Sequence, residues 1–142
     1  MKVYAAIDTN VLVSSLLTKN PDSPTARVVD AVASGVIIPL YNVDILAEYD
    51  EVLRRPKFPF TEGRVRKLID MVQGFGVAVD PKPTGEILPD VDDLVFYEVV
   101  MEKRDENAYL VTGNVKHVPS RRYIVTPAEM MEIIAGEPDT PS

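Results

Sequence analysis

The chain has 142 residues, 46% of them hydrophobic and 26% charged, and its formal net charge at pH 7 is −7. This length and composition predict one soluble globular domain that buries a sizeable core, and the negative charge argues against a surface that is basic throughout. Cysteine is absent and histidine occurs once, at His117, which excludes disulfides, thiolate metal sites, a cysteine nucleophile and a multi-histidine zinc site.

Apolar strands alternate with helices along the chain. In order, the pattern predicts a strand at residues 2–7, helices at 10–17 and 24–34, a strand at 36–40, helices at 43–55 and 62–73, a strand at 77–79, a helix at 91–101, strands at 108–111 and 123–125, and a helix at 127–135. Residues suited to helix capping mark five of the helix starts: Ser23, Asn42, Thr61, Asp90 and Thr126.

This alternation is typical of an α/β protein. We expect a three-layer α/β/α sandwich whose central sheet is mainly parallel and covered by helices on both faces. Residues 1–135 are expected to form the domain, and residues 136–142 a flexible C-terminal tail.

Asp8 follows the first predicted strand directly, and more polar residues and a helix come after it. Open α/β sheets bind their ligands at the carboxyl ends of their strands, and a buried carboxylate is unfavourable without a cation or hydrogen bonds. Asp8 is therefore expected to meet other polar side chains.

Acids in two of the predicted helices are candidates to meet that aspartate. Glu48 borders the apolar stripe of its helix on one edge and Asp50 borders it on the other, so helical spacing leaves both open. A solvated surface acid is the alternative interpretation for each. Asp93 begins the apolar stripe of the next candidate helix, and its alternative is a first-turn carboxylate stabilised by the helix dipole, which Asp92 fits better still.

Polar residues also follow the strand predicted at 108–111, namely Thr112 and Asn114. An ordinary strand-to-loop turn would account for both, but in a parallel sheet they share an edge with Asp8. Three carboxylates gathered at that edge would repel one another unless a divalent cation neutralised them. Oxygen ligands favour Mg²⁺ or Mn²⁺, so the residues predict a cation site of this kind.

Four segments carry a further pattern, in order along the chain. They are DTNVLVS at 8–14, the helix that contains Glu48 and ends in RRPKF at 54–58, DDLVFYE at 92–98 and LVTGNVKH at 110–117. Together they resemble the motifs of PIN-domain ribonucleases, and most closely the group described as toxins of toxin–antitoxin systems. The likeness runs from residue 2 to about 135. It implies an α/β/α sandwich with an acidic cleft that holds Mg²⁺ or Mn²⁺ for cleavage of RNA phosphodiester bonds.

Transferred residue by residue, the resemblance implies three metal-binding catalytic acids, Asp8, Glu48 and Asp93. It also implies a set of supporting polar residues, which are Asn10, Ser14, Asp92, Thr112 and Asn114. Many PIN domains have an aspartate where this chain has Asn114. The neutral side chain can supply a carbonyl ligand, but the site loses one negative charge, which disfavours a second cation.

RNA requires positive charge at the cleft. A basic cluster follows the last motif and is expected to rim the cleft and contact phosphates, with a solvated surface as the alternative: Lys116, His117, Arg121 and Arg122. The resemblance further implies a homodimer and an antitoxin partner. No apolar run reaches the length of a membrane span and no signal-peptide pattern is present, so we expect a cytoplasmic protein.

The sequence leaves two other functions open. The chain could keep the fold as a binding module with weak or no catalytic activity, an alternative that Asn114 motivates. It could also be a phosphoacceptor signalling domain, since such domains gather aspartates with a threonine and a lysine at strand ends, although the early acidic pair of those domains is missing.

Overall fold

The computed structural model describes residues 2–81, 85, 91–113 and 122–136, except for the side chains of residues 91–93. Five strands form one sheet in the order β3-β2-β1-β4-β5, and every pair of neighbours is parallel. The strands are β1 (Val3–Ile7), β2 (Ile37–Tyr41), β3 (Val77–Ala78), β4 (Tyr109–Val111) and β5 (Ile124–Val125).

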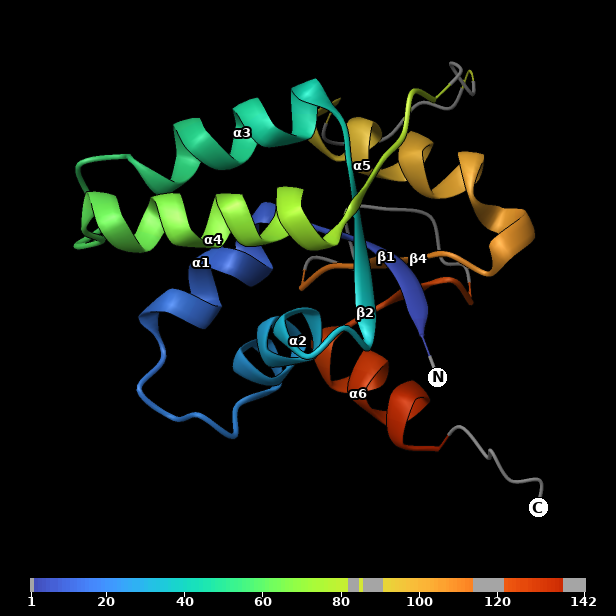
Figure 1. Cartoon of the computed structure of the whole chain (residues 1–142), viewed down its shortest axis with the longest axis horizontal. Helices are drawn as coiled ribbons and strands as arrows, with labels where there is room; N and C mark the ends of the chain where they lie inside the picture. The colour runs from blue at the N-terminus through green and yellow to red at the C-terminus, as the bar shows by residue number, and fades with distance from the viewer. Residues whose placement is uncertain (1, 82–84, 86–90, 114–121, 137–142) are drawn as a thin grey trace.

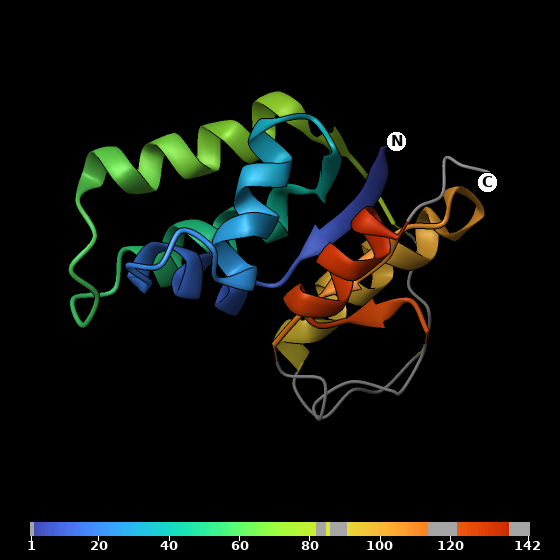
Figure 2. The same cartoon turned by 90° about the horizontal axis from the view of Figure 1, so that it is seen from below.

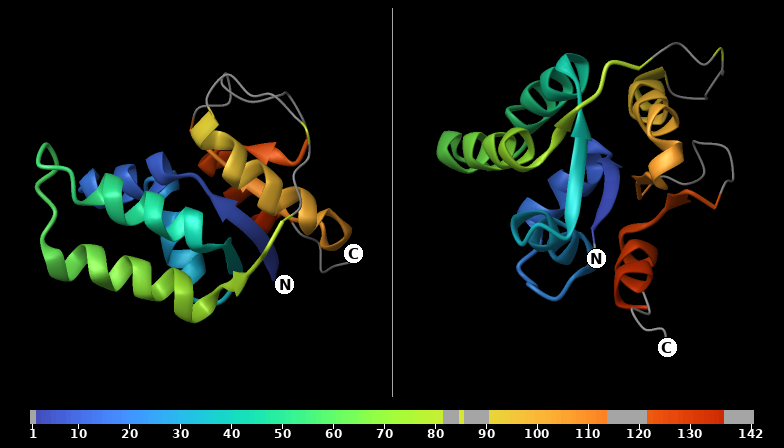
Figure 3. Two further views of the ribbon diagram at one scale, coloured as in Figure 1. Left: turned by 90° about the horizontal axis from the view of Figure 1, so that it is seen from above. Right: turned by 45° about the vertical axis from the view of Figure 1, so that its right-hand side comes forward.

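Helices connect these strands and cover the sheet. They are α1 (Thr9–Leu17), α2 (Pro24–Ala33), α3 (Val43–Leu53), α4 (Glu62–Phe75), α5 (Val91–Glu102) and α6 (Pro127–Ala135), with a short 3₁₀ helix η1 (Arg104–Glu106). Helix α5 lies on one side of the sheet, and α2 and α6 pack together on the other (Figure 1, Figure 2). Helices α3 and α4 run as a neighbouring pair (Figure 3). The predicted α/β/α sandwich with a parallel sheet is confirmed.

The predicted capping residues begin the helices that the structure describes in full. The side chains of Ser23, Asn42 and Thr61 each accept a hydrogen bond from the backbone N–H three residues later. Thr126 and Glu129 form the predicted capping box, with bonds of 3.1 and 2.8 Å. The first backbone N–H groups of a helix have no partner within the helix, and these side chains supply one. Local sequence therefore sets where these helices begin.

Two features of the backbone were not predicted. Helix η1 ends at Asn107, whose φ of 59° lies in the left-handed region that asparagine tolerates better than most residues. Gly76 ends α4 in close contact with β2, and a Cβ at this position would lie 2.4 Å from the carbonyl oxygens of Pro39 and Val72. Only glycine therefore lets α4 end against the sheet at this distance.

The central strand β1 is buried on both faces, with Ala5, Ala6 and Ile7 no more than 1% exposed. From β1 the chain builds the sheet toward β2 and β3, and later returns to place β4 on the other side of β1. This reversal makes a topological switch point between β1 and β4, where open parallel sheets bind ligands at the carboxyl edge. Among the described residues, no helix is long and apolar enough to cross a membrane.

Candidate active site

Asp8 lies at the switch point, directly after β1, and its side chain is only 6% exposed. The hydroxyl of Thr112, which follows β4, donates to Asp8 Oδ2 at 2.6 Å, and Asn10 Nδ2 donates to the same oxygen at 2.8 Å. No described side chain donates to the other oxygen, Oδ1. Burial raises the pKa of Asp8 above 3.8, while hydrogen bonds from Thr112, from Asn10 and from the backbone of Thr9 oppose that rise.

Asn10 joins the ends of the two central strands. Its Nδ2 holds Asp8, and its Oδ1 accepts a hydrogen bond of 3.2 Å from the backbone N–H of Gly113. A Cβ on Gly113 would lie 3.3 Å from that same Oδ1, so the glycine gives the carboxamide room to approach. One side chain thus fixes both the carboxylate after β1 and the backbone after β4.

The structure distinguishes the two acids of α3 that helical spacing left open. Glu48 is half-buried, and its Oε2 accepts a hydrogen bond of 3.1 Å from the hydroxyl of Thr9, the neighbour of Asp8. Asp50 is exposed and forms an ion pair of 2.7 Å with Arg54 on the same helix. Of the two, it is Glu48 that lies beside the end of β1.

Tyr49 supports this arrangement from within the core. Its ring is fully buried, and its hydroxyl donates to the carbonyl oxygen of Ile7 at 2.5 Å. Burial raises the pKa of Tyr49 far above its usual value, and the charges of Asp8 and Glu48 raise it further. The hydrogen bond from Tyr49 thus joins the chain neighbours of two predicted acids, since Tyr49 follows Glu48 and Ile7 precedes Asp8.

The side chains of Asp92 and Asp93 lie outside the described residues, although their backbone forms the first turn of α5. That turn comes directly before Phe96, whose ring lies 6.0 Å from the ring of Tyr49. Within the described part of the chain, no three acidic, histidine or cysteine side chains lie close enough to hold a metal ion. The side chain of Asp93, the third predicted acid, lies outside that part of the chain.

The remaining predicted site residues divide into three groups. Ser14 is exposed on α1, one turn after Asn10. The positions of a further group fall outside the described residues and stay predictions: Asn114, Lys116, His117 and Arg121. Arg122 is described, and it lies elsewhere.

Arg122 comes just before β5 and lines a cavity together with Arg104 and Tyr109. Because β4 and β5 are parallel, the residues that precede them lie at the amino edge of the sheet, opposite Asp8. The expectation that Arg122 rims the Asp8 cleft is therefore wrong. Arg122 follows Thr112 in the sequence, which suggested that it lies close to the Asp8 cleft. A strand parallel to β4, however, can begin only at the amino edge of the sheet, opposite Thr112.

Two residues of the site were not expected from the sequence, Thr9 and Tyr49. Thr9 stands between two predicted site residues, but a hydroxyl in a helical pattern gives no sign of its partner. Tyr49 carried a usable signal, because a tyrosine in an apolar stripe must find a hydrogen-bond partner when it is buried. Its partner is the last carbonyl of β1, which accounts for the position of α3 over the strand end.

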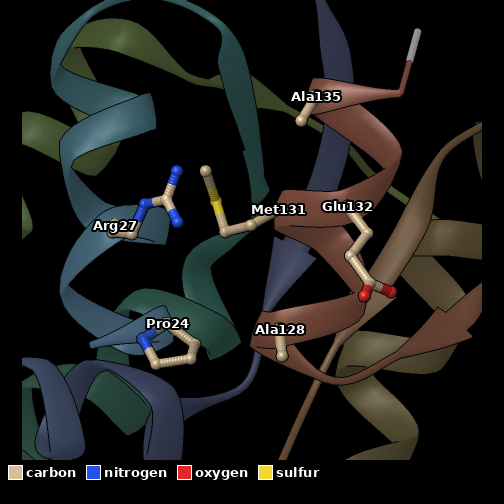
Figure 4. Close-up of a pocket in the computed structure, with 6 residues that line it drawn as sticks. All are labelled: Pro24, Arg27, Ala128, Met131, Glu132 and Ala135. Atoms are coloured by element: carbon tan, nitrogen blue, oxygen red, sulfur yellow. The ribbon is translucent and has the colours of Figure 1, made fainter. Parts of the chain in front are cut away.

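The pockets formed by the described residues are lined by side chains other than Asp8 and Glu48. One of them lies between α2 and α6, is lined by residues of both helices and has a volume of about 210 Å³ (Figure 4). Met131 extends from α6 toward Arg27 of α2 within it, and Glu132 is the acid among its lining residues. A lone exposed carboxylate at such a groove lacks the neighbours that surround Asp8.

Comparison with known proteins places this fold and site in a family. The family model described as "PIN domain" matches residues 4–116, which include both Asp8 and Thr112. The chain belongs to the PIN domain family. The family resemblance of the four motifs is thereby confirmed.

Two further similarities accompany this PIN domain. An uncharacterized protein of Methanocaldococcus jannaschii is 27% identical over 149 residues, covering 93% of this chain and 92% of its own length. A crystal structure of VapBC2 from Rickettsia felis, bound to a DNA fragment from their promoter, aligns with a TM-score of 0.47 and 20% identity. That alignment covers 80% of this chain and 90% of the other.

Proposed function

We propose that this PIN domain is a metal-dependent endoribonuclease that cleaves phosphodiester bonds of RNA. The observation that carries the proposal is Asp8, a buried carboxylate at the switch point whose two side-chain donors both bind Oδ2. This arrangement fixes the orientation of the carboxylate and leaves Oδ1 without a side-chain donor among the described residues. A buried negative charge of this kind is stabilised best by a cation.

The residues present fit a hard divalent ion. The proposed donors are carboxylate oxygens from Asp8, Glu48 and Asp93, a ligand set that suits Mg²⁺ or Mn²⁺. The raised pKa of Asp8 fits as well, because a bound cation favours the charged form that burial disfavours. When bound, such an ion lowers the pKa of water and stabilises the charge that develops on the phosphate.

The described side chains have separate roles in this proposal. Thr112 and Asn10 hold the Asp8 carboxylate in one orientation, so it need not reorganise when RNA arrives. The Thr9 hydroxyl donates to Oε2 of Glu48 and thereby holds this second proposed ligand beside the end of β1. Tyr49 fixes the peptide that precedes Asp8 and thereby the separation of the two acids.

The substrate and partners follow from the motif resemblance. We propose single-stranded or looped RNA as substrate, because a recessed acidic site must reach an accessible backbone. Lys116, His117 and Arg121 are proposed to contact its phosphates. The proposal extends to a homodimer and to the role of toxin in a toxin–antitoxin pair, which co-purification with the product of a neighbouring gene tests directly.

Cleavage of a fluorescent single-stranded RNA tests the activity, with Mg²⁺ or Mn²⁺ and with EDTA. Asp8→Asn and Glu48→Gln are each expected to lower the rate at least about a hundredfold, the usual size of a lost acid–base or electrostatic contribution. Asp93→Asn tests the third acid. Asp50→Asn is the matched control, because this exposed acid lies on the same helix as Glu48 and its ion pair is local.

Full activity in EDTA, or unchanged rates in both Asp8→Asn and Glu48→Gln, would refute the proposal. A stable complex with a partner and metal binding, but no turnover of any RNA, would favour the inactive binding module instead.

A further inference from the structure

A second polar cavity lies at the amino ends of β4 and β5. It has a volume of about 500 Å³ and is lined by Arg104, Asn107, Tyr109, Arg122, Tyr123 and Ile133. Sites for small ligands commonly enclose about 300–1,000 Å³. Since Asp8 and Thr112 stand at the carboxyl ends of the strands, this cavity is separate from the candidate active site.

Arg104 is held in place within this cavity. Its Cζ lies 4.4 Å from the centre of the Tyr123 ring, and its Nη1 donates to the carbonyl oxygen of Ala108. A guanidinium has five N–H donors, so a single hydrogen bond leaves most of them for a ligand. A guanidinium that is already oriented loses little conformational freedom when it binds an anion.

Arg122 contributes a second guanidinium to the same cavity and is exposed to solvent. The ion pairs among the described residues involve other arginines, namely Arg54, Arg55 and Arg66. Asp105 and Glu106 stand next to Arg104 in the chain, but they are exposed and neither lines the cavity. The lining thus carries two positive charges and no negative one, in a protein whose net charge is −7.

The rest of the lining suits a flat, partly polar group. Tyr109 and Tyr123 stand beside each other at the starts of neighbouring strands, and Ile133 of α6 adds an apolar surface. Asn107 offers a carboxamide, and its left-handed conformation is what turns the chain from η1 toward β4. Aromatic rings that stack on bases and arginines that bind phosphate recur where proteins hold nucleotides.

We propose that this cavity binds a nucleotide, with its phosphate on Arg104 and Arg122 and its base against Tyr109 and Ile133, since Arg104 already covers one face of the Tyr123 ring. The nucleotide is either free in solution or part of an RNA chain, since both present the same phosphate and base. The site is independent of the proposed catalysis at Asp8.

Isothermal titration calorimetry on the full chain, in EDTA, tests this site with three probes. They are adenosine 5′-monophosphate, a 2′-O-methyl oligoadenylate of about six residues that resists cleavage, and inorganic phosphate. Arg122→Gln is expected to weaken nucleotide binding about tenfold, as loss of one charge-assisted contact does. Arg104→Lys keeps the positive charge but loses the planar set of N–H donors of the guanidinium, and it is expected to weaken nucleotide binding as well.

Two controls distinguish binding in this cavity from general charge attraction and from binding at the candidate active site. Arg66→Gln removes the same charge from an exposed site on α4 and is expected to leave affinity unchanged. The amide chemical shifts of Asp8 and Thr9 are expected to stay unchanged when adenosine 5′-monophosphate is added, because Asp8 lies at the opposite edge of the sheet. Amide chemical shifts of Tyr109 and Tyr123 that move on titration would locate the ligand.

The three probes give distinct outcomes. Binding of the oligonucleotide at least about tenfold tighter than the monophosphate assigns the site to an RNA strand, whereas similar affinities assign it to free nucleotides. Inorganic phosphate binding as tightly as either probe overturns the proposal, because the base then contributes nothing. Absence of binding at millimolar concentration, or affinity unaffected by Arg122→Gln, overturns it too.

Discussion

Replacing Asp8 by asparagine should make the metal-free protein more stable while it lowers the proposed activity at least about a hundredfold. The substitution is nearly isosteric, and both side-chain donors to Asp8 bind one oxygen, Oδ2. An asparagine whose carbonyl oxygen takes that place keeps the hydrogen bonds from Thr112 and Asn10. What is lost is a negative charge on a side chain that is almost fully buried.

The size of this effect follows from what the replacement keeps and removes. The side-chain bonds to Oδ2 are kept, whereas hydrogen bonds from the backbone of Asn10 and Thr9 are lost. Burial has the larger effect on Asp8, so this loss offsets only part of the relief of desolvation. Stabilising substitutions of this kind contribute about 0.5–2 kcal/mol. A gain of about 1 kcal/mol raises the melting temperature of a domain of this size by about 3 °C. The matched control, Asp50→Asn at an exposed ion pair, should change stability by less than about 0.5 kcal/mol.

The pH dependence has a definite sign. Burial raises the pKa of Asp8 in the folded state above 3.8, its ordinary value, so folding favours the protonated carboxyl. That contribution to stability is complete below the ordinary pKa and is lost as pH rises through the raised one. The advantage of the Asp8→Asn variant should therefore be larger at pH 8 than at pH 4 and shrink as the pH falls toward 3.8.

Thermal unfolding followed by circular dichroism, in EDTA between about pH 4 and 8, measures the difference. Adding Mg²⁺ to about one hundred times its dissociation constant should stabilise the wild type by about 2.7 kcal/mol and the variant far less. A variant less stable than the wild type at pH 7 in EDTA, or an advantage that does not change with pH, would refute the account of Asp8 as a destabilising buried charge.

Three further substitutions test the surrounding structure by urea denaturation. Tyr49→Phe leaves the buried carbonyl of Ile7 without its hydrogen-bond donor and should lower the free energy of unfolding by about 1–3 kcal/mol. An unchanged urea midpoint would mean that water replaces the hydroxyl. Gly76→Ala forces a Cβ against two backbone oxygens and should cost about 1–3 kcal/mol or more, whereas Gly63→Ala, with open space around it, should not destabilise in this way. Thr126→Ala removes one half of a capping box and should lower the free energy of unfolding by about 1 kcal/mol. Thr126→Ser keeps the hydroxyl and should retain most of that stability.

Local sequence was sufficient for most of the fold. The strands and helices were predictable because apolar periodicity coincided with capping residues such as Ser23, Asn42 and Thr126, each of which caps its helix in the structure. Helix η1 was missed, because a three-residue 3₁₀ turn has no periodicity to detect.

The candidate site was predictable where it follows from the edge of a parallel sheet. Asp8 and Thr112 meet because β1 and β4 are neighbouring parallel strands, as their positions after two strands suggested. The choice of Glu48 over Asp50 required the position of α3, which Tyr49 fixes through a contact 42 residues distant in sequence. Arg122 was misplaced because proximity in sequence was taken as proximity in space, and a parallel connection breaks that relation.

The hydrogen bond from Thr112 to Asp8 joins residues 104 positions apart, and it has a consequence for synthesis of the protein on the ribosome. Chains emerge at about 5–20 residues per second, with the N-terminal part first. The nascent chain therefore carries Asp8 and Glu48 well before the strand that delivers Thr112 exists. A protein proposed to cut RNA thus completes its site only once the chain has been synthesised beyond Thr112, 104 residues after Asp8.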